Sequence, residues 1–366
     1  MKFIYPLLVL VTVSVTPIFA QTQGEDFLNM SWKDVATKMP SEWYGTEQAK
    51  AVAENVLMGQ RDIGGWPKNQ SYHHVLTKSE RVQVLNDKTK VGATFDNGAT
   101  ITELKFLAKV YAQFEDARYH QAFMRGLDYI FESQYDNGGW PQFYPVREGK
   151  SVAYSAYITY NDDAMVSVMA FLYDIVTGHS LFKPLQIHED TKVKAQEAFD
   201  QGVMCILNTQ IVINGQATVW CAQHDHVTLA PAKAREYELP SFSGSESVGI
   251  TRLLMEIDNP SQAVITAVNA AIHWFETHKI EGVRLEKVVE EDGRKNLLAI
   301  ADPAATPLWA RFYDLETEEP FFCDRDGIKR EALSDISYER RNGYRWYVDS
   351  PVRLLKEYAE WSAKWN

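Results

Sequence analysis

Oxygen-rich side chains cluster where two apolar stretches with helical spacing begin. Asn161, Asp162 and Asp163 stand in a row before one stretch, and Asp96 and Asn97 precede another. Aspartate and asparagine are common helix caps, so capping alone explains one residue at each start. A cap needs only one side chain, however, and carboxylates gathered at a loop–helix junction are also the hard oxygen ligands that suit Ca²⁺. We therefore interpret Asp162 and Asp163 as candidate Ca²⁺ ligands.

Arginine side chains on predicted loops supply the opposite charge. They are Arg235, Arg325 and the adjacent pair Arg340 and Arg341. The planar guanidinium binds a carboxylate through two parallel hydrogen bonds. Their partners are either carboxylates of the chain itself, such as Glu236 or Glu238 beside Arg235, or an anionic substrate.

The composition limits the class of protein. The chain has 366 residues, 45% of them apolar, with 37 Lys and Arg against 49 Asp and Glu, a net charge of −12. This excludes a disordered chain, and the acidic balance argues against a general nucleic-acid binder, which needs a basic field. Aromatic residues are abundant, with 10 Trp, 18 Tyr and 17 Phe. Trp66 and Trp140, each in a Gly-Gly-Trp-Pro loop, either fill the core or present an indole to a sugar ring.

Residues 1–20 have the features of a secretory signal peptide. A positive start at Lys2 is followed by an apolar run over 3–15 and by a small residue at Ala20. The run is short for a membrane anchor, and no later segment is apolar and long enough to cross a bilayer. We therefore expect export to the periplasm or the extracellular space, and a mature chain, 21–366, that forms a single domain and a monomer.

An internal repeat predicts the fold. The segment from Gln60 to Pro67 returns between Gln134 and Pro141, and a looser copy leads from Gln210 to Trp220. A helical pattern precedes each copy, and another follows it, with polar residues at its start. The first set covers 47–58, 119–133 and 193–209, and the second covers 101–114, 164–177 and 248–257. Helix pairs repeated in this way are typical of an α/α toroid, in which the polar helix starts face one cavity.

The less regular parts of the sequence complete the predicted fold. Residues 260–280 and 351–365 have helical patterns, and short strands are expected within 285–298, 309–315 and 322–327. Cys205, Cys221 and Cys323 show no zinc-binding spacing, and a disulfide between the first two remains open.

The whole set of motifs resembles the pectate lyases of polysaccharide lyase family 10. The resemblance covers nearly all of the mature chain and rests on the order of its motifs, which are 64–69, 94–100, 137–145, 160–165, 220–240, 325–327 and 339–344. It implies an (α/α)3 toroid with short β segments that cleaves polygalacturonate, an α-1,4-linked chain, by Ca²⁺-dependent β-elimination.

The resemblance also implies roles for individual residues. Arg235 matches the catalytic base, Asp96 an essential cleft aspartate and Asp162 a calcium-binding aspartate. Arg325 matches a substrate-binding arginine, and a further one falls at Arg340 or Arg341. We add Trp140, Asn161 and Tyr237 as substrate-binding residues. Gly98 stands where many relatives have aspartate, which bears on the fine geometry beside Asp96.

Two other functions stay open at this stage. One is an inverting glycosidase on a similar helical ring, with Asp96 and Asp162 as acid and base. The other is a non-catalytic relative that binds pectin. The products separate these alternatives, because elimination leaves a double bond conjugated to the carboxylate and hydrolysis does not.

Overall fold

Helices packed in pairs are the main elements of the fold. The computed structural model describes residues 26–365, and the expected leader at 1–20 lies outside them. The long helices are α2 (Glu47–Gly59), α4 (Ile101–Phe114), α5 (Ala117–Glu132), α6 (Ala164–Val176), α7 (Glu189–Thr209), α8 (Glu246–Met255), α9 (Gln262–Thr277) and α11 (Ser350–Trp365). Shorter helices are α1 (Trp32–Lys38), α3 (Lys78–Asn86) and α10 (Tyr338–Gly343). None of the helices within 26–365 has the length and apolar character needed to cross a membrane.

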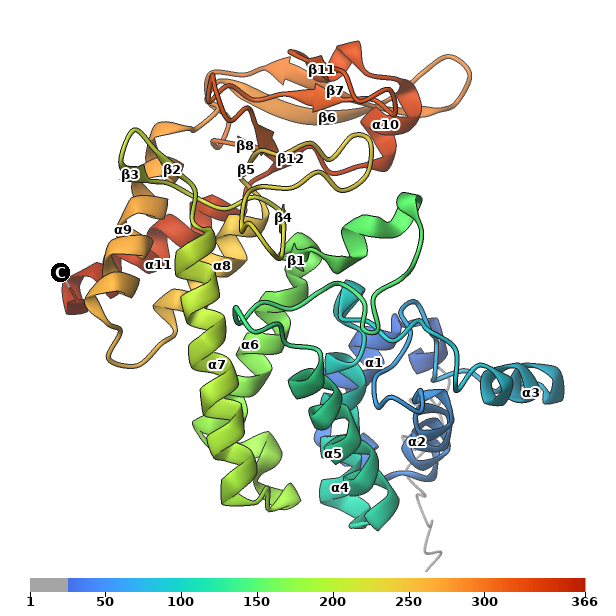
Figure 1. Cartoon of the computed structure of the whole chain (residues 1–366). Helices are drawn as coiled ribbons and strands as arrows, with labels where there is room; N and C mark the ends of the chain where they lie inside the picture. The colour runs from blue at the N-terminus through green and yellow to red at the C-terminus, as the bar shows by residue number, and fades with distance from the viewer. Residues whose placement is uncertain (1–25, 366) are drawn as a thin grey trace, which may run out of the picture.

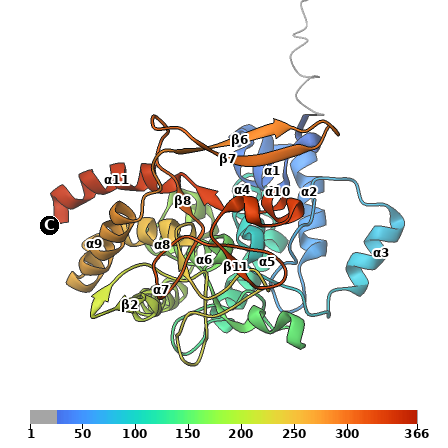
Figure 2. The same ribbon diagram turned by 90° about the horizontal axis from the view of Figure 1, so that it is seen from above.

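The helices form two rows that pack against each other. Helices α4, α6, α8 and α11 contact one another in that order, with α2 and α5 on α4, α7 on α6 and α9 on α8 (Figure 2). Each helix buries one face. In α5, for example, Tyr119, Phe123, Leu127 and Ile130 recur at helical spacing and are fully buried, while Asp116 caps the helix start. The mainly α toroid that the repeat predicts is thus confirmed.

The repeated tryptophans are part of the core. The indole N–H of Trp66 donates to the Val56 carbonyl at 2.8 Å, and Trp140 and Trp220 bind Ile130 and Ile206 in the same way, at 2.9 and 2.8 Å. These carbonyls lie in the last turns of α2, α5 and α7, where a helix leaves them without partners of its own. Trp140 is only 1% exposed. The expectation that Trp140 contacts substrate is therefore corrected, because its ring is enclosed and its one polar group is already used.

A fourth copy of this contact is present. Trp309 donates to the Phe275 carbonyl, near the end of α9, at 2.9 Å. The sequence repeat did not reveal it, because the hairpin of β6 (Val283–Val289) and β7 (Lys295–Ala301) separates the helix from its tryptophan.

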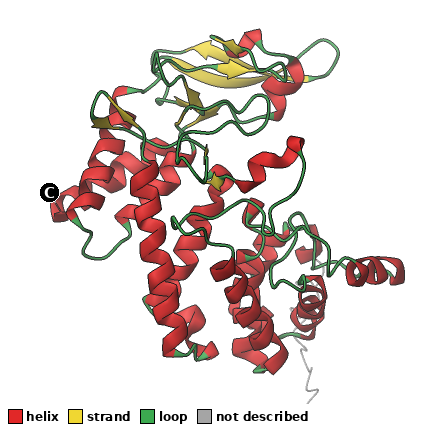
Figure 3. Cartoon of the chain, in the orientation of Figure 1, coloured by secondary structure: helices red, strands yellow, loops and turns green. Residues whose placement is uncertain are grey.

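Short strands gather mainly at one end of the helices (Figures 1 and 3). The hairpin β6–β7 and the strands near 309–323 confirm the predicted strand regions. The other strands are two residues long and pair antiparallel in twos: β1 (Ile158–Thr159) with β4 (Gln223–His224), β2 (Val212–Ile213) with β3 (Gln216–Ala217), β5 (Phe242–Ser243) with β9 (Phe312–Tyr313), β8 (Trp309–Ala310) with β12 (Tyr347–Val348), and β10 (Phe322–Cys323) with β11 (Lys329–Arg330). The three cysteines are buried and free, so the open Cys205–Cys221 disulfide does not form.

Single 3₁₀ turns lie before or between the helices. They are η2 (Asp26–Asn29), η3 (Ser41–Gly45), η4 (Asp96–Gly98), η5 (Lys150–Ala156), η6 (Asn161–Asp163), η7 (Ser180–Leu185) and η8 (Leu333–Asp335). The turns η4 and η6 directly precede α4 and α6 and pack against each other. The two polar helix starts therefore meet at one place, as the repeat predicted.

A buried carboxyl in the first turn of α4 makes stability depend on pH. Trp32 donates its indole N–H to Oε1 of Glu103 at 2.7 Å, whereas Oε2 has no hydrogen-bond partner. Burial raises the pKa of Glu103 from 4.5 to about 7. The folded protein then holds a proton that the unfolded chain releases, so the free energy of unfolding falls as pH rises from about 4.5 through 7.

Replacing this carboxyl tests that dependence. Glu103→Gln keeps an acceptor for Trp32 and cannot ionise. We expect it to gain stability relative to the wild type between pH 5 and pH 8, by about 1–3 kcal/mol. Urea unfolding at the two pH values measures the difference. An equal effect at both would show that Glu103 does not titrate in this range.

Candidate active site

The two turns at the helix starts have an unusual backbone. Asn97, Asp162 and Asp163 have φ values of 55°, 52° and 57°, in the left-handed region that few residues other than glycine adopt. Asparagine and aspartate tolerate it best, and such strain is concentrated at functional sites. Asp163 occupies the N-cap position of α6 but makes no capping hydrogen bond with its side chain. Capping therefore does not explain the run of acidic residues.

A small polar hollow of about 140 Å³ opens between the turns η4 and η6 and the loop that follows β4. Pairing of β1 with β4 brings that loop to η6, since the backbone N–H groups of Tyr160 and Asn161 both donate to the Ala222 carbonyl at 2.9 Å. The lining residues are Lys68, Asp96, Asn97, Gln142, Tyr154, Asn161, Asp162, Gln223, Arg235 and Glu238. The structure thus brings together four of the residues predicted to bind metal or substrate or to act in catalysis: Asp96, Asn161, Asp162 and Arg235.

Asp96 is buried and forms an ion pair with Lys68. Its backbone N–H donates to the Thr94 hydroxyl at 3.0 Å, which holds the turn in place. Sequence reasoning assigned no role to Lys68. It lies two positions after the buried Trp66, so the tryptophan that anchors the loop also positions this lysine at the hollow.

Arg235 is held by a carboxylate of its own loop. Its Nε donates to Oε2 of Glu238 at 2.7 Å and Nη2 donates to Oε1. Glu238 is 3% exposed and also accepts a hydrogen bond from the Tyr344 hydroxyl, at 2.9 Å. Burial acts to lower the pKa of Arg235, but the hydrogen bonds and charge of Glu238 outweigh it and raise the pKa. The arginine is therefore firmly protonated while this pair is intact.

A second arginine, Arg311, contacts the turn η6 beside the hollow. Arg311, 7% exposed, donates from Nη2 to Oδ1 of Asn161 at 3.0 Å and lies 3.6 Å from Oδ1 of Asp162. It also pairs with buried Glu246, and its guanidinium lies 4.8 Å from the centre of the Tyr344 ring. Burial would lower the pKa of Arg311, but Glu246 and other anions raise it, so a fixed positive charge sits beside Asp162. No local motif indicated this contact, because Arg311 falls in a predicted strand far along the chain.

Asp163 faces a different hollow from Asp162. It lines a space of about 310 Å³ among α1, α4, α6 and α8, together with Lys33, Lys105 and Arg252. Burial, together with the negative charges of Glu246 and Asp162, raises the pKa of Asp163. The expectation that Asp163 binds the metal together with Asp162 is corrected, because adjacent residues with these φ values direct their side chains into separate cavities.

The remaining predicted arginines separate into two groups. Arg340 and Arg325 lie 4.6 and 5.8 Å from the centre of the Tyr237 ring, and each pairs with Glu339. Arg341 instead donates to Asn296 and to the Ile336 carbonyl, both at 2.9 Å, and so supports the β-rich end of the molecule. Of the two adjacent arginines, Arg340 is the one that lies beside Tyr237, and its contact with substrate stays a prediction.

The aromatic ring of Tyr237 contacts the guanidinium groups of several arginines. It is 4% exposed, and the Arg235 guanidinium also lies 5.1 Å from its ring centre. Three guanidiniums thus surround one ring, an arrangement favoured by the attraction of cations to aromatic faces. Tyr237 also lines a neighbouring hollow of about 510 Å³, so its contact with substrate stays a prediction.

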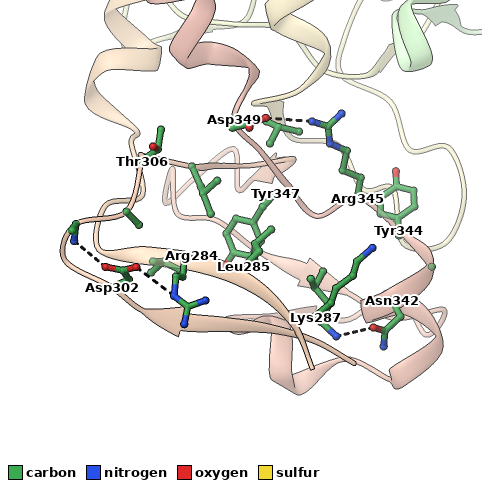
Figure 4. A pocket seen from close by; sticks show the side chains of 17 residues that line it. Arg284, Leu285, Lys287, Asp302, Thr306, Asn342, Tyr344, Arg345, Tyr347 and Asp349 are labelled. Carbon is green, nitrogen blue, oxygen red and sulfur yellow. Dashed lines mark hydrogen bonds and ion pairs between the residues drawn. The ribbon is translucent and has the colours of Figure 1, made fainter. Parts of the chain in front are cut away.

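A larger hollow lies elsewhere, beneath the β6–β7 hairpin (Figure 4). It measures about 1020 Å³. Its charges are largely paired within the protein, with Arg284 3.3 Å from Asp302 and Arg345 3.6 Å from Asp349. None of the candidate catalytic residues lines it.

The small hollow has oxygen donors that fit a calcium ion in part. Within residues 26–365 no group of three or more His, Cys, Asp or Glu side chains is placed to share a metal ion. Asp162 presents a carboxylate to the hollow, and Oε1 of Gln142 is buried there without a hydrogen-bond partner. Ca²⁺ takes six to eight oxygen ligands. These donors suit it, and water and substrate oxygens would have to complete its coordination.

Comparison with known proteins identifies the family. Residues 60–355 match the family model of pectic acid lyase. A family 10 polysaccharide lyase from Cellvibrio cellulosa is 33% identical, covering 92% of this chain and 95% of its own, with a TM-score of 0.76. A mutant of a family 10 lyase from the same organism, solved with trigalacturonic acid, is 32% identical, covering 92% and 96%, also with a TM-score of 0.76. No curated protein matches the chain.

The fold and the matches define the class: the protein is a polysaccharide lyase built on an (α/α)3 toroid. It belongs to the pectic acid lyase family, family 10 of the polysaccharide lyases. The resemblance found in the sequence motifs is thereby confirmed.

Proposed function

We propose that the protein is an exported, calcium-dependent pectate lyase that cleaves α-1,4-polygalacturonate by anti β-elimination. The observation that carries the proposal is that Asp96, Asp162 and Arg235, from three distant segments, line one hollow. The trigalacturonic acid bound to a similar lyase mutant supports the substrate class. Export rests on the residues at 1–20.

The chemical demand of this reaction is charge neutralisation. Elimination removes the hydrogen at C5, forms the C4–C5 double bond and breaks the bond from C4 to the glycosidic oxygen, which takes a proton from water. The C5 hydrogen is weakly acidic because negative charge develops beside a carboxylate. Fixed positive groups in a water-poor site stabilise such charge. Lys68 lines the hollow and Arg311 lies beside its Asn161 and Asp162, and these two residues provide such groups.

Different residues in and near the hollow abstract the proton, bind the sugar carboxylates and hold the metal ion. Arg235 takes the C5 proton in the fraction of molecules whose guanidinium has lost its own proton, a fraction that alkaline pH increases. Arg325 and Arg340 bind carboxylates of neighbouring sugars through their guanidiniums. Asp162 and the free Oε1 of Gln142 would hold the calcium ion. When bound, Ca²⁺ supplies positive charge that polarises the sugar carboxylate.

One assay tests the function. We expect the enzyme to release products with ultraviolet absorbance from polygalacturonate at alkaline pH with Ca²⁺ present. New reducing ends without this absorbance would instead indicate a glycosidase that uses Asp96 and Asp162. Binding of polygalacturonate without any product would indicate a non-catalytic pectin-binding protein.

The Arg235–Glu238 pair sets the pH at which Arg235 acts as a base. Because the carboxylate stabilises the charged guanidinium, Glu238→Gln is expected to lower the pKa of Arg235. The acidic limb of the profile of kcat/KM against pH then moves to lower pH, by about one unit. If the acidic limb of the profile stays at the same pH while kcat is retained, Glu238 does not control the pKa of Arg235.

A further inference from the structure

Arg311 is fixed where the β-rich end of the molecule meets the helices. It lies between β8 and β9, where its backbone N–H donates to the Trp346 carbonyl at 2.7 Å and its own carbonyl accepts from the Gly244 N–H at 3.1 Å. Both of its backbone groups are therefore used, and the residue is only 7% exposed. The short strands thus hold this guanidinium against the turn η6, which lies 150 positions away in the sequence.

Glu246, at the start of α8, anchors the guanidinium. It is 4% exposed, and its two carboxylate oxygens accept hydrogen bonds from Arg311 and from the Ser243 hydroxyl. A buried charge without a partner is costly, so each member of this ion pair depends on the other. Nε of Arg311 is nevertheless buried without a hydrogen-bond partner. The orientation of the guanidinium is therefore set by Glu246 and the turn η6, at the cost of one unsatisfied donor.

The same guanidinium orients the amide of Asn161. Nη2 of Arg311 donates to Oδ1 of Asn161 at 3.0 Å, and the amide nitrogen on the other side donates to Oδ2 of Asp162 at 2.7 Å. Nη2 also lies 3.6 Å from Oδ1 of Asp162. Both carboxylate oxygens of Asp162 therefore face a group whose position depends on Arg311. This support matters because the Asp162 side chain is 44% exposed and has few other restraints.

We propose that Arg311 is a positioning residue for the calcium ligand Asp162, that it acts through Asn161, and that Glu246 holds it in place. A strained backbone such as that of η6 persists only where the surrounding structure supports it, and Arg311 gives this support from the β-rich end. Groups behind a metal ligand orient it, and their replacement typically changes metal affinity or activity by about 10- to 100-fold. The inference rests on the proposed function and extends it to a residue that does not line the hollow.

Calcium titrations of Arg311→Lys test the inference. Lysine keeps the positive charge but lacks the planar guanidinium, so it cannot hold Glu246 and Asn161 in the same positions. We expect the Ca²⁺ concentration for half-maximal activity, and the Kd in calorimetric titration with Ca²⁺ alone, each to rise about 10- to 100-fold. Saturating Ca²⁺ is expected to restore kcat. A kcat that is lowered equally at every Ca²⁺ concentration would show a merely structural role.

A double-mutant cycle shows whether Arg311 acts through Asp162. In the Asp162→Asn background, Arg311→Lys is expected to cause little further rise in the Ca²⁺ requirement, because the carboxylate that it positions is already gone. Equal rises in both backgrounds would overturn the inference. Arg252→Lys is the matched control, since Arg252 pairs with Glu357 at 2.8 Å, between α8 and α11, and does not line the catalytic hollow. It is expected to leave the Ca²⁺ requirement unchanged.

Asn161→Ala provides a second test that does not depend on the folding of Arg311→Lys. It removes the amide between Arg311 and Asp162 but leaves the ion pair of Arg311 with Glu246, so no buried charge loses its partner. The Kd for Ca²⁺ is expected to rise about tenfold. An unchanged Kd would contradict the role given to Arg311.

Binding of Ca²⁺ alone separates this inference from the proposed function. If the wild type forms no ultraviolet-absorbing product but Arg311→Lys weakens Ca²⁺ binding, the lyase function fails and the positioning role stands. If the product forms but Arg311→Lys and Asn161→Ala bind Ca²⁺ like the wild type, the positioning role fails alone. If the wild type binds no Ca²⁺, the positioning role fails whether or not the product forms.

Discussion

Arg235→Lys is expected to lower kcat on polygalacturonate by about two to four orders of magnitude, the usual contribution of a positioned general base. Lysine keeps the positive charge but lacks the planar fork that binds both oxygens of Glu238. Its amine therefore takes neither the position nor the orientation that the guanidinium has at the hollow. The initial rate of ultraviolet absorbance at saturating substrate measures the change.

A loss of kcat in a variant of Arg235 must be distinguished from unfolding of that variant. Arg235→Ala leaves the buried carboxylate of Glu238 without its main partner, which is costly, so the lysine variant is the cleaner test. Arg341→Lys is the matched control, since Arg341 contacts Asn296 and the Ile336 carbonyl and lies away from the hollow. If Arg235→Lys retains full turnover, Arg235 is not the base.

Helices with an apolar face were predictable from the sequence, and helices without one were not. The spacing of apolar residues gave α4 at 101–114, the bounds that the structure has. Helix α3 was missed because none of its residues is buried, so it has no periodic pattern. Its Thr77–Glu80 capping box was the only local signal.

The candidate site was predictable where it depends on local motifs. The pairing of Arg235 with Glu238 was one of the alternatives that the sequence left open, because the two lie three positions apart on one loop. The contact of Arg311 with Asn161 spans 150 positions and has no local signature. The separation of Asp162 from Asp163 depends on two consecutive left-handed residues, which a sequence of acidic side chains does not specify.

Asp162→Asn is expected to raise the Ca²⁺ concentration needed for half-maximal activity by about 100-fold or more, and excess chelator to abolish wild-type activity until Ca²⁺ is restored. Asparagine has the same shape and tolerates the positive φ of 52°, so the change removes a charge and little else. Activity measured across a calcium titration gives the shift. Full activity in excess chelator would exclude the metal role.

The neighbouring aspartate provides the control and decides between two effects of the charge. Asp163→Asn is the same substitution at nearly the same φ, but its side chain lines the other hollow, so it should leave the calcium requirement unchanged. If Asp162 only repelled the anionic substrate, its neutralisation would lower KM and raise activity at low substrate. If it is a metal ligand, the same change lowers activity and added Ca²⁺ recovers part of it. The two roles of Asp162 therefore predict opposite changes in activity. Arg311, beside Asp162, stays charged in the wild type and in the variant, so its charge does not account for the difference.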